Sequence, residues 1–329
     1  MSEARPVLVT GASGFVGSAI ARTLVEHGIE TFGLSRRTRQ TETGGIRWVQ
    51  GDIRETSPLE ATLRHCGTVI NVAGRTGLPA DDAEAAEFFA INRDAVAALA
   101  ATARQAGVNR FIHISSTGVF GPGEGDFDEE SPCRPANVYE QSKLAGEHAL
   151  RAMGGPPMEI AVIRPSNVFG ERHPWHKLLT WMRAVKRGRA LLAGDPEAYQ
   201  VNYLYVGDVA ETLCRLVRHP RPLPPCLILN TPVSVHAFFE ATTAAVGGPG
   251  SGYRTLPAAL LRGAARLLEG VARRTGRSSP LTCEKVAELT GTQVFRSRQT
   301  LLDTLGFPPL GLEAGLARTA AWYREAGLL

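Results

Sequence analysis

The chain has 329 residues, of which 43% are apolar and 21% are charged, a composition typical of a soluble globular protein with a large core. The net charge of +4 comes from scattered basic residues and gives no broad nucleic-acid footprint, and no run of about 18 uncharged apolar residues predicts a transmembrane span. The five cysteines lie far apart and are odd in number, which favours reduced thiols and predicts no metal site. Because the first residues enter a strand pattern without an apolar signal core, we expect a cytoplasmic protein.

Short apolar runs, mostly rich in β-branched residues, follow one another through the first half of the chain. Helix-like segments separate most of them, and this alternation predicts parallel strands joined by helical crossovers. We therefore expect a doubly wound α/β sheet in a Rossmann domain over residues 1–165, to which later strands can be added. The runs are PVLVT (6–10), ETFGLS (30–35), IRWVQ (46–50), TVINVA (68–73), RFIHIS (110–115) and MEIAVIRP (158–165).

The pattern changes after Pro165, where helical segments dominate. Two strand-like runs, VNYLYV (201–206) and CLILN (226–230), and two Gly/Pro turns interrupt them. We expect residues 166–329 to form mainly a smaller, mostly helical substrate-binding lobe on the strand ends.

Three glycines, Gly11, Gly14 and Gly17, stand between the first predicted strand and an amphipathic helix. The first allows a tight turn, the second lets the backbone approach a pyrophosphate, and the third lets helix and strand pack closely. The helix N-terminus then faces the anion. The loop predicts a dinucleotide site.

Cofactor choice is set where the second strand ends, in GLSRR (33–37). An acidic residue there would bind the ribose 2′-hydroxyl of NAD, whereas Ser35, Arg36 and Arg37 suit the 2′-phosphate of NADP. We expect NADP(H) to be preferred, with NAD(H) as the alternative and exposed loop arginines as the competing explanation. Asp52, after the third strand, is either an acceptor for the adenine amino group or a turn aspartate.

Tyr139 and Lys143 lie four residues apart on a predicted helix and therefore on one face of it. Alone, this spacing is weak evidence for a catalytic pair. In combination with other motifs, the chain resembles the extended short-chain dehydrogenase/reductases, the NAD-dependent epimerase/dehydratase superfamily, over nearly its whole length. The motifs that carry the resemblance, in family order, are TGASGFVG (10–17), GDI (51–53), NVAG (71–74), Asn92, SSTGVFG (115–121) and YEQSK (139–143).

The resemblance implies that Tyr139 is the acid/base of a hydride transfer and that Ser116 hydrogen-bonds the substrate oxygen. A free phenol is a poor base at neutral pH, so the charge of Lys143 is needed to favour phenolate; a turn-capping serine is the alternative for Ser116. Asn92 resembles the family's structural asparagine. The expected cofactor contacts are Gly11, Ser13, Gly14, Phe15, Val16, Gly17, Arg36, Arg37, Asp52, Ile53, Ala73, Tyr139, Lys143 and Pro165.

Departures from the family pattern bear on the substrate. Thr117 and Gly118 replace the acidic pair of 4,6-dehydratases, which disfavours elimination of water. Val201 stands where nucleotide-sugar enzymes commonly place a diphosphate-binding arginine, whereas Asn167 matches their asparagine near the diphosphate. The C-terminal tail is similar to that of the 3β-hydroxysteroid dehydrogenase-like branch. The expected substrate contacts are Thr117, Asn167, Trp175 and His176.

A basic amphipathic helix is predicted within residues 257–276, with an apolar stripe that runs from Leu260 to Val271. The simpler interpretation is that this stripe packs on the lobe, and the alternative is that it touches a membrane surface or guides an apolar substrate. By resemblance we expect a homodimer, formed through the helix with the Tyr/Lys pair and the one before it, although an intramolecular core explains that earlier helix equally well.

Three functions remain open at this point. The leading one is an NADP(H)-preferring oxidoreductase that interconverts a ketone and a secondary alcohol on an apolar or non-nucleotide substrate. The second is a nucleotide-sugar 4-epimerase that uses the same Tyr139, Lys143 and Ser116 with transient hydride transfer. The third is a non-catalytic NADP-sensing protein, which retention of both Tyr139 and Lys143 disfavours.

Overall fold

The computed structural model describes residues 5–37, 42–153, 155–173, 177–220, 222–275 and 282–329. Its main element is a sheet with the strand order β12-β8-β6-β5-β1-β2-β4-β3, in which all neighbours are parallel except the short antiparallel pair β3–β4. Each of the six apolar runs predicted as parallel strands is a strand of this sheet, and the doubly wound fold is confirmed. The strands are β1 (Val7–Thr10), β2 (Thr31–Ser35), β3 (Glu42–Thr43), β4 (Ile46–Gln50), β5 (Thr68–Asn71), β6 (Arg110–Ile114), β8 (Glu159–Pro165) and β12 (Cys226–Leu229).

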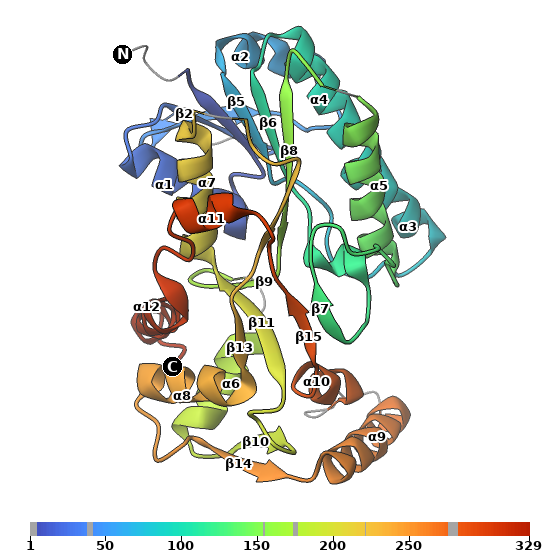
Figure 1. Cartoon of the computed structure of the whole chain (residues 1–329), viewed down its shortest axis with the longest axis vertical. Coiled ribbons are helices and arrows are strands. Elements are labelled where there is room, and N and C mark those ends of the chain that lie inside the picture. Colours follow the sequence, from blue (N-terminus) through green and yellow to red (C-terminus); the bar gives the residue numbers. More distant parts are fainter. Residues whose placement is uncertain (1–4, 38–41, 154, 174–176, 221, 276–281) are drawn as a thin grey trace.

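Helices cover both faces of the sheet, so successive side chains of a strand enter two different cores. In β1, Val7 and Val9 point into one core, which also holds Ile20, whereas Leu8 points into the other, with Leu99. Figure 1 shows α1 and α7 on the first face and α4 and α5 on the second. The helices of this half are α1 (Phe15–Glu26), α2 (Glu60–His65), α3 (Asp82–Phe89), α4 (Val96–Gln105), α5 (Val138–Ala152) and α7 (Val206–Arg218), with the 3-10 turns η1 (Ser57–Leu59) and η3 (Thr117–Phe120).

A π-helical turn, η2 (Ala90–Ala95), joins α3 to α4 within the segment expected to face a dimer partner. Phe88 and Val96 of this segment are each 1% exposed and lie inside the chain's own fold, and the guanidinium of Arg93 covers the ring of Phe89. The chain's own fold thus buries Phe88 and Val96 and leaves Phe89 half-buried, and the homodimer stays a prediction.

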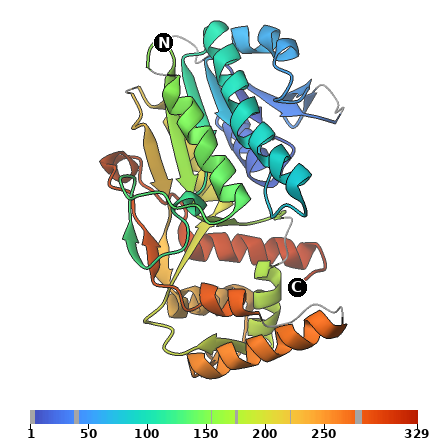
Figure 2. The ribbon, with the colours of Figure 1, turned by 90° about the vertical axis from the view of Figure 1, so that its right-hand side faces the viewer.

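The smaller lobe begins at the carboxyl end of β8, because β9 starts two residues after that strand ends. Its core continues the core on the α1 face, with the Tyr203 ring stacked on Phe238 at 5.0 Å between centroids. Figure 2 shows this lobe below the sheet. Its strands are β9 (Asn167–Phe169), β10 (Ala190–Ala193), β11 (Gln200–Tyr205), β13 (Pro232–Ser234) and β14 (Tyr253–Leu256), and its helices are α6 (Lys177–Lys186), α8 (Val235–Val246), α9 (Ala258–Thr275), α10 (Cys283–Glu288), α11 (Thr300–Thr304) and α12 (Gly311–Glu325).

The two halves share strands and polar contacts. β12 comes from the region expected to belong mainly to the lobe, yet it extends the main sheet beside β8. β7 (Gly125–Phe127), from the Rossmann half, pairs in parallel with β15 (Gln293–Phe295), near the end of the chain. Glu129 follows β7 and accepts hydrogen bonds from the backbone N–H groups of Ile228 and Arg298, at 3.0 and 2.9 Å.

Candidate active site

The glycine loop after β1 forms a cradle that only glycine fits. Gly11 has a φ of 63°, and a Cβ placed on it would lie 2.9 Å from the backbone nitrogen of Ala73, at the end of β5. A Cβ on Gly17 would lie 2.2 Å from the carbonyl oxygen of Gly11. Helix and loop therefore approach as closely as the sequence predicts.

The N-terminus of α1 opens on this cradle. Its N-cap residue, Gly14, offers no side-chain cap, and the first turn holds no acidic residue. The free N–H groups at this end carry the positive pole of the helix dipole, which suits a pyrophosphate. Ser13 and Gly14 are exposed, and Phe15 and Val16 are half-buried. The residues present thus fit the diphosphate of a dinucleotide.

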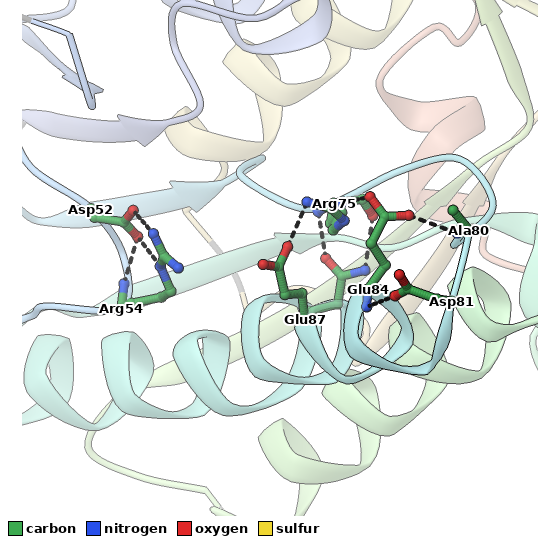
Figure 3. A network of polar contacts seen from close by, with 8 residues as sticks. Asp52, Arg54, Arg75, Ala80, Asp81, Glu84 and Glu87 are labelled. Atoms are coloured by element: carbon green, nitrogen blue, oxygen red, sulfur yellow. Dashed lines mark hydrogen bonds and ion pairs between the residues drawn. The ribbon is translucent and has the colours of Figure 1, made fainter.

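The expected adenosine end of the site lies beyond β2. Arg36 and Arg37 are exposed there, and the N–H of Arg37 donates to the hydroxyl of Ser35 at 3.3 Å. Asp52 is engaged by Arg54, whose backbone N–H and Nη2 donate to its carboxylate at 3.0 and 2.8 Å (Figure 3). The Arg54 hydrogen bond lowers the pKa of Asp52. Any adenine contact of Asp52 must therefore coexist with this turn, while Ile53 beside it is buried.

Tyr139 lies in the first turn of α5, whose start is fixed by a reciprocal cap. Asn137 Oδ1 accepts from the N–H of Glu140 at 3.0 Å, and Glu140 Oε2 accepts from the N–H of Ala136 at 2.7 Å. Burial raises the pKa of Tyr139, and the polar side chain of Ser116 nearby opposes the rise.

Ser116 caps a turn, as one of the two alternatives had it, and its contact with a substrate oxygen stays a prediction. It is the N-cap of η3, and its Oγ accepts from the N–H of Gly118 at 3.0 Å. The same side chain lies near the phenol of Tyr139. Capping the turn therefore holds the serine next to the tyrosine.

Lys143 is 5% exposed and lies one turn after Tyr139. Its Nζ donates to the carbonyl oxygen of Ile114, the last residue of β6, and lies close to Gly74 after β5. Burial lowers the pKa of Lys143 to about 8, an effect that the carboxylate of Glu147 opposes. The ammonium group is thus fixed where the neighbouring strands β6 and β5 end.

The loop after β5 is held against α5 through Asn92, as expected for a structural residue. Asn92 is fully buried; its Oδ1 accepts from the backbone of Arg75 at 2.8 Å, and its Nδ2 donates to Ser142 Oγ at 2.8 Å. Arg75 in turn forms ion pairs with Glu84 and Glu87 of α3, each at 2.7 Å (Figure 3). The strand end beside the lysine is therefore rigidly placed.

Sequence reasoning missed a polar row beneath the site. Thr10 Oγ1 donates to Asn71 Oδ1 at 2.6 Å, and Asn71 Nδ2 lies 3.0 Å from Nδ1 of His113. Burial is the main cause that lowers the pKa of His113 well below its usual value, so the ring is neutral at pH 7. The sequence does show three polar residues within apolar runs, which could have indicated this row. The parallel register of the strands makes these three residues neighbours.

A second missed feature is a buried ion pair behind Lys143. Glu147 is fully buried, and its Oε2 lies 2.6 Å from Nη2 of Arg164 on β8, whose exposed fraction is 1%. Its Oε1 accepts from the hydroxyl of Ser115 at 2.5 Å. In the sequence, only the glutamate one helical turn after Lys143 could have indicated this ion pair.

The residues expected to contact the substrate differ in their exposure to solvent. Asn167 is exposed at the start of β9, directly after the buried Pro165 and Ser166, whereas Thr117 is only 6% exposed. Trp175 and His176 lie outside the described residues. Val201 is 2% exposed and belongs to the core, so no charged group replaces the missing arginine at that position.

The described part of the chain holds neither a cluster of three metal-ligating side chains nor a helix long and apolar enough to cross a membrane.

A doubly wound sheet, a glycine cradle and a Ser/Tyr/Lys set at the strand ends define an enzyme of the extended short-chain dehydrogenase/reductase type. Residues 7–230 match the sequence model of the NAD dependent epimerase/dehydratase family, and the chain belongs to this family.

Individual relatives point to more than one substrate class. The UDP-glucose 4-epimerase of Streptomyces lividans is 30% identical over 245 residues, which cover 68% of this chain and 74% of that protein. Sterol demethylase protein B of Methylococcus capsulatus is 27% identical, with coverage of 98% and 99%. The solved structure of MoeE5 in complex with UDP-glucuronic acid and NAD is 25% identical, with a TM-score of 0.70 and coverage of 98% and 99%.

These likenesses change the order of our expectations. NAD-dependent enzymes that act on nucleotide sugars support the epimerase alternative better than a reductase of an apolar ketone, which the sequence had led us to place first. The cofactor bound in the MoeE5 structure is NAD, and a preference for NADP has no support from that structure.

Proposed function

We propose that the protein is an NAD(P)-dependent 4-epimerase of a nucleotide-diphosphate sugar. The observation that carries this proposal is the joint placement of Ser116, Tyr139 and Lys143 beside the glycine cradle, in a chain without the acidic pair of a dehydratase. The likeness to a UDP-glucose 4-epimerase and to a UDP-sugar complex supports the substrate class.

In this proposal, side chains of the protein accept the hydroxyl proton of the sugar and later return it. Ser116 donates a hydrogen bond to the reacting oxygen of the sugar, and ionised Tyr139 accepts the hydroxyl proton as the C–H bond of the same carbon breaks. Lys143 stabilises the phenolate through its charge. Gly11, Gly14 and Gly17 would hold the diphosphate of an NAD(P), which would supply reversible hydride transfer at that carbon and, once the ketose has turned over, at its opposite face. Tyr139 gives the proton back, so the sugar ends inverted and the cofactor unchanged.

Loss of water is disfavoured by the groups around Ser116. Thr117 is buried, and Gly118 has no side chain. The carboxylate of Glu140 lies beside Gly118 but accepts the N–H of Ala136 in the cap of α5. Elimination needs a free acid and base at these positions.

A second candidate, a dehydrogenase or reductase of an apolar alcohol or ketone, has one observation in its favour. The side chain of Val201 is in the core at the position where a diphosphate-binding arginine is common, and a sterol-processing relative aligns over almost the whole chain. A diphosphate without that bidentate partner loses charge-assisted hydrogen bonds.

A cofactor-conversion assay separates the two candidates. The purified protein is incubated with UDP-glucose, UDP-galactose or UDP-glucuronic acid and, separately, with a 3β-hydroxysterol or its ketone, with NAD(H) and NADP(H). The epimerase proposal expects inverted sugar with no net change in absorbance at 340 nm. Conversion of the sterol with one equivalent of NAD(P)H formed or consumed, and no sugar inversion, would overturn it.

For the cofactor itself, we propose that NADP(H) binds more tightly than NAD(H). This proposal is supported by Arg36 and Arg37, which are exposed at the end of β2 where NAD enzymes place a carboxylate. An Arg36→Ser variant should lose at least tenfold in NADP⁺ affinity and keep its NAD⁺ affinity, as measured by calorimetry. Equal losses for both cofactors would contradict the 2′-phosphate contact.

A further inference from the structure

Helix α9 lies at the far end of the smaller lobe, opposite the end of the molecule that carries α2 (Figures 1 and 2). It packs on the lobe through a narrow stripe. Leu261 and Ala265 of α9 join Ala193 of β10 and Val286 of α10 in a small core.

A second apolar stripe on α9 faces outward. Leu260, Leu267 and Val271 are 63%, 70% and 50% exposed, and Leu268 beside them is 37% exposed. The spacing of seven and four residues aligns the first three along one side of the helix. The interpretation that the whole stripe packs on the lobe was therefore wrong for these residues, because Leu261 alone supplies the large buried side chain.

The segment that carries this stripe is strongly basic. Residues 253–275 contain five arginines and one glutamate, and Glu269 accepts the backbone N–H of Cys283, which turns that carboxylate toward the lobe. Arg254, Arg262 and Arg274 are exposed. Arg274, three residues after Val271, lies on the ridge side of α9, whereas Arg262, two residues after Leu260, lies on the other side of the helix and Arg254 belongs to β14. An apolar ridge on such a basic segment complements a surface that offers hydrocarbon beneath negative charge.

We propose that α9 docks the protein on an anionic lipid bilayer, with Leu260, Leu267 and Val271 at the boundary between headgroups and acyl chains. Arg274 then lies at the level of the lipid phosphates, and the other arginines add attraction to the anionic surface from further away. A second copy of this chain is a poorer occupant, because a symmetric contact through α9 would bring two basic segments together. The proposal holds for either candidate function, since it concerns where the enzyme works and not which bond it breaks.

Vesicle flotation tests this directly. The full-length protein is mixed with vesicles of phosphatidylcholine alone or with 30% phosphatidylserine, at about 50 and 500 mM salt. We expect flotation with the anionic vesicles at low salt and at least a tenfold weaker partition on neutral vesicles or at high salt. A Leu267→Asp, Val271→Asp variant should lose at least tenfold in partition on anionic vesicles.

Matched controls keep the result interpretable. Leu78→Asp adds a charge at a leucine that is 76% exposed and lies in the Rossmann half, so partition should stay at the wild-type value. Arg262→Gln, Arg274→Gln should weaken binding to anionic vesicles without changing the thermal midpoint of unfolding. Equal flotation of all variants, or no flotation at all, would overturn the proposal. Loss of a concentration-dependent dimer in the α9 variant, without any vesicle binding, would assign the surface to a second copy instead.

Discussion

Glu147 and Arg164 form an ion pair in which neither side chain reaches solvent, with exposed fractions of 0% and 1%. The pair joins α5, which carries Tyr139 and Lys143, to β8 of the main sheet. The hydroxyl of Ser115, which precedes Ser116, donates to the same carboxylate. One buried charge therefore fixes both segments from which the Ser/Tyr/Lys set is built.

Removal of one member of this pair should be costly. Glu147→Gln leaves the Arg164 guanidinium buried without its counter-charge, and we expect the free energy of unfolding to fall by about 3–5 kcal/mol. Urea denaturation followed by circular dichroism measures this. In the double variant Glu147→Leu, Arg164→Met the buried charges are absent, and most of the loss should be recovered. If the double variant loses as much free energy of unfolding as Glu147→Gln, the unpaired buried charge is not the cause of the loss.

Tyr139→Phe should remove catalysis and leave cofactor binding intact. The ring still packs at the start of α5, but no group remains to exchange the substrate proton, so kcat should fall by about 10²–10⁴-fold. Turnover assays and cofactor titration check the two halves of this expectation. Tyr253→Phe, which removes a hydroxyl that contacts His236 in the smaller lobe, is the matched control and should keep wild-type turnover. Wild-type rates in Tyr139→Phe would contradict its role as acid/base.

The pH dependence follows from the two opposite pKa shifts. The active form for the first oxidation pairs protonated Lys143 with ionised Tyr139, yet burial lowers the pKa of the lysine to about 8 and raises that of the tyrosine. Below pH 8 the lysine keeps its proton while the ionised share of the tyrosine grows with pH. Above pH 8 each further gain in phenolate is matched by loss of protonated lysine. We expect kcat/KM to rise tenfold per pH unit up to about pH 8 and then to level off until the tyrosine ionises.

Lys143→Arg provides the control for this profile. Arginine keeps its proton throughout the range, so the bend near pH 8 should vanish and the rising limb should continue to the pKa of the tyrosine. An unchanged bend in this variant would show that another group titrates there.

Gly17→Ala should disturb the cradle. The new Cβ would lie 2.2 Å from the carbonyl oxygen of Gly11, so the loop must move. We expect NAD(P) affinity to drop at least tenfold and stability to fall by about 1–3 kcal/mol. Gly263→Ala in α9, where the added Cβ meets no atom within 4 Å, should instead be neutral or stabilising. Calorimetric titration and thermal unfolding distinguish the two substitutions, and equal cofactor affinity in both would contradict the close approach at Gly17.

The features that the sequence predicted are those that local patterns determine. The parallel strands follow from apolar runs, and the glycine cradle from spacing next to such a run. The contacts of His113 with Asn71 and of Glu147 with Arg164 depend on which residues sit opposite one another across strands and helices, and no local period reports this. The prediction for the α9 stripe was wrong for a related reason. Periodicity identifies the apolar side of a helix, but it does not tell how much of that side the rest of the lobe covers.

The pairing of β7 with β15 bears on how this chain can be altered or recombined. A strand that follows the turn bearing Ser116 has its hydrogen-bond partner about 170 residues later, and Glu129 adds links to Ile228 and Arg298, which lie about 100 and 170 residues further along the chain. The unit that can be exchanged between relatives is therefore not the segment after residue 165 alone. A chimera that imports a foreign lobe must also import residues 125–129, or the grafted strand and the segment that follows the Ser116 turn will each lack a partner.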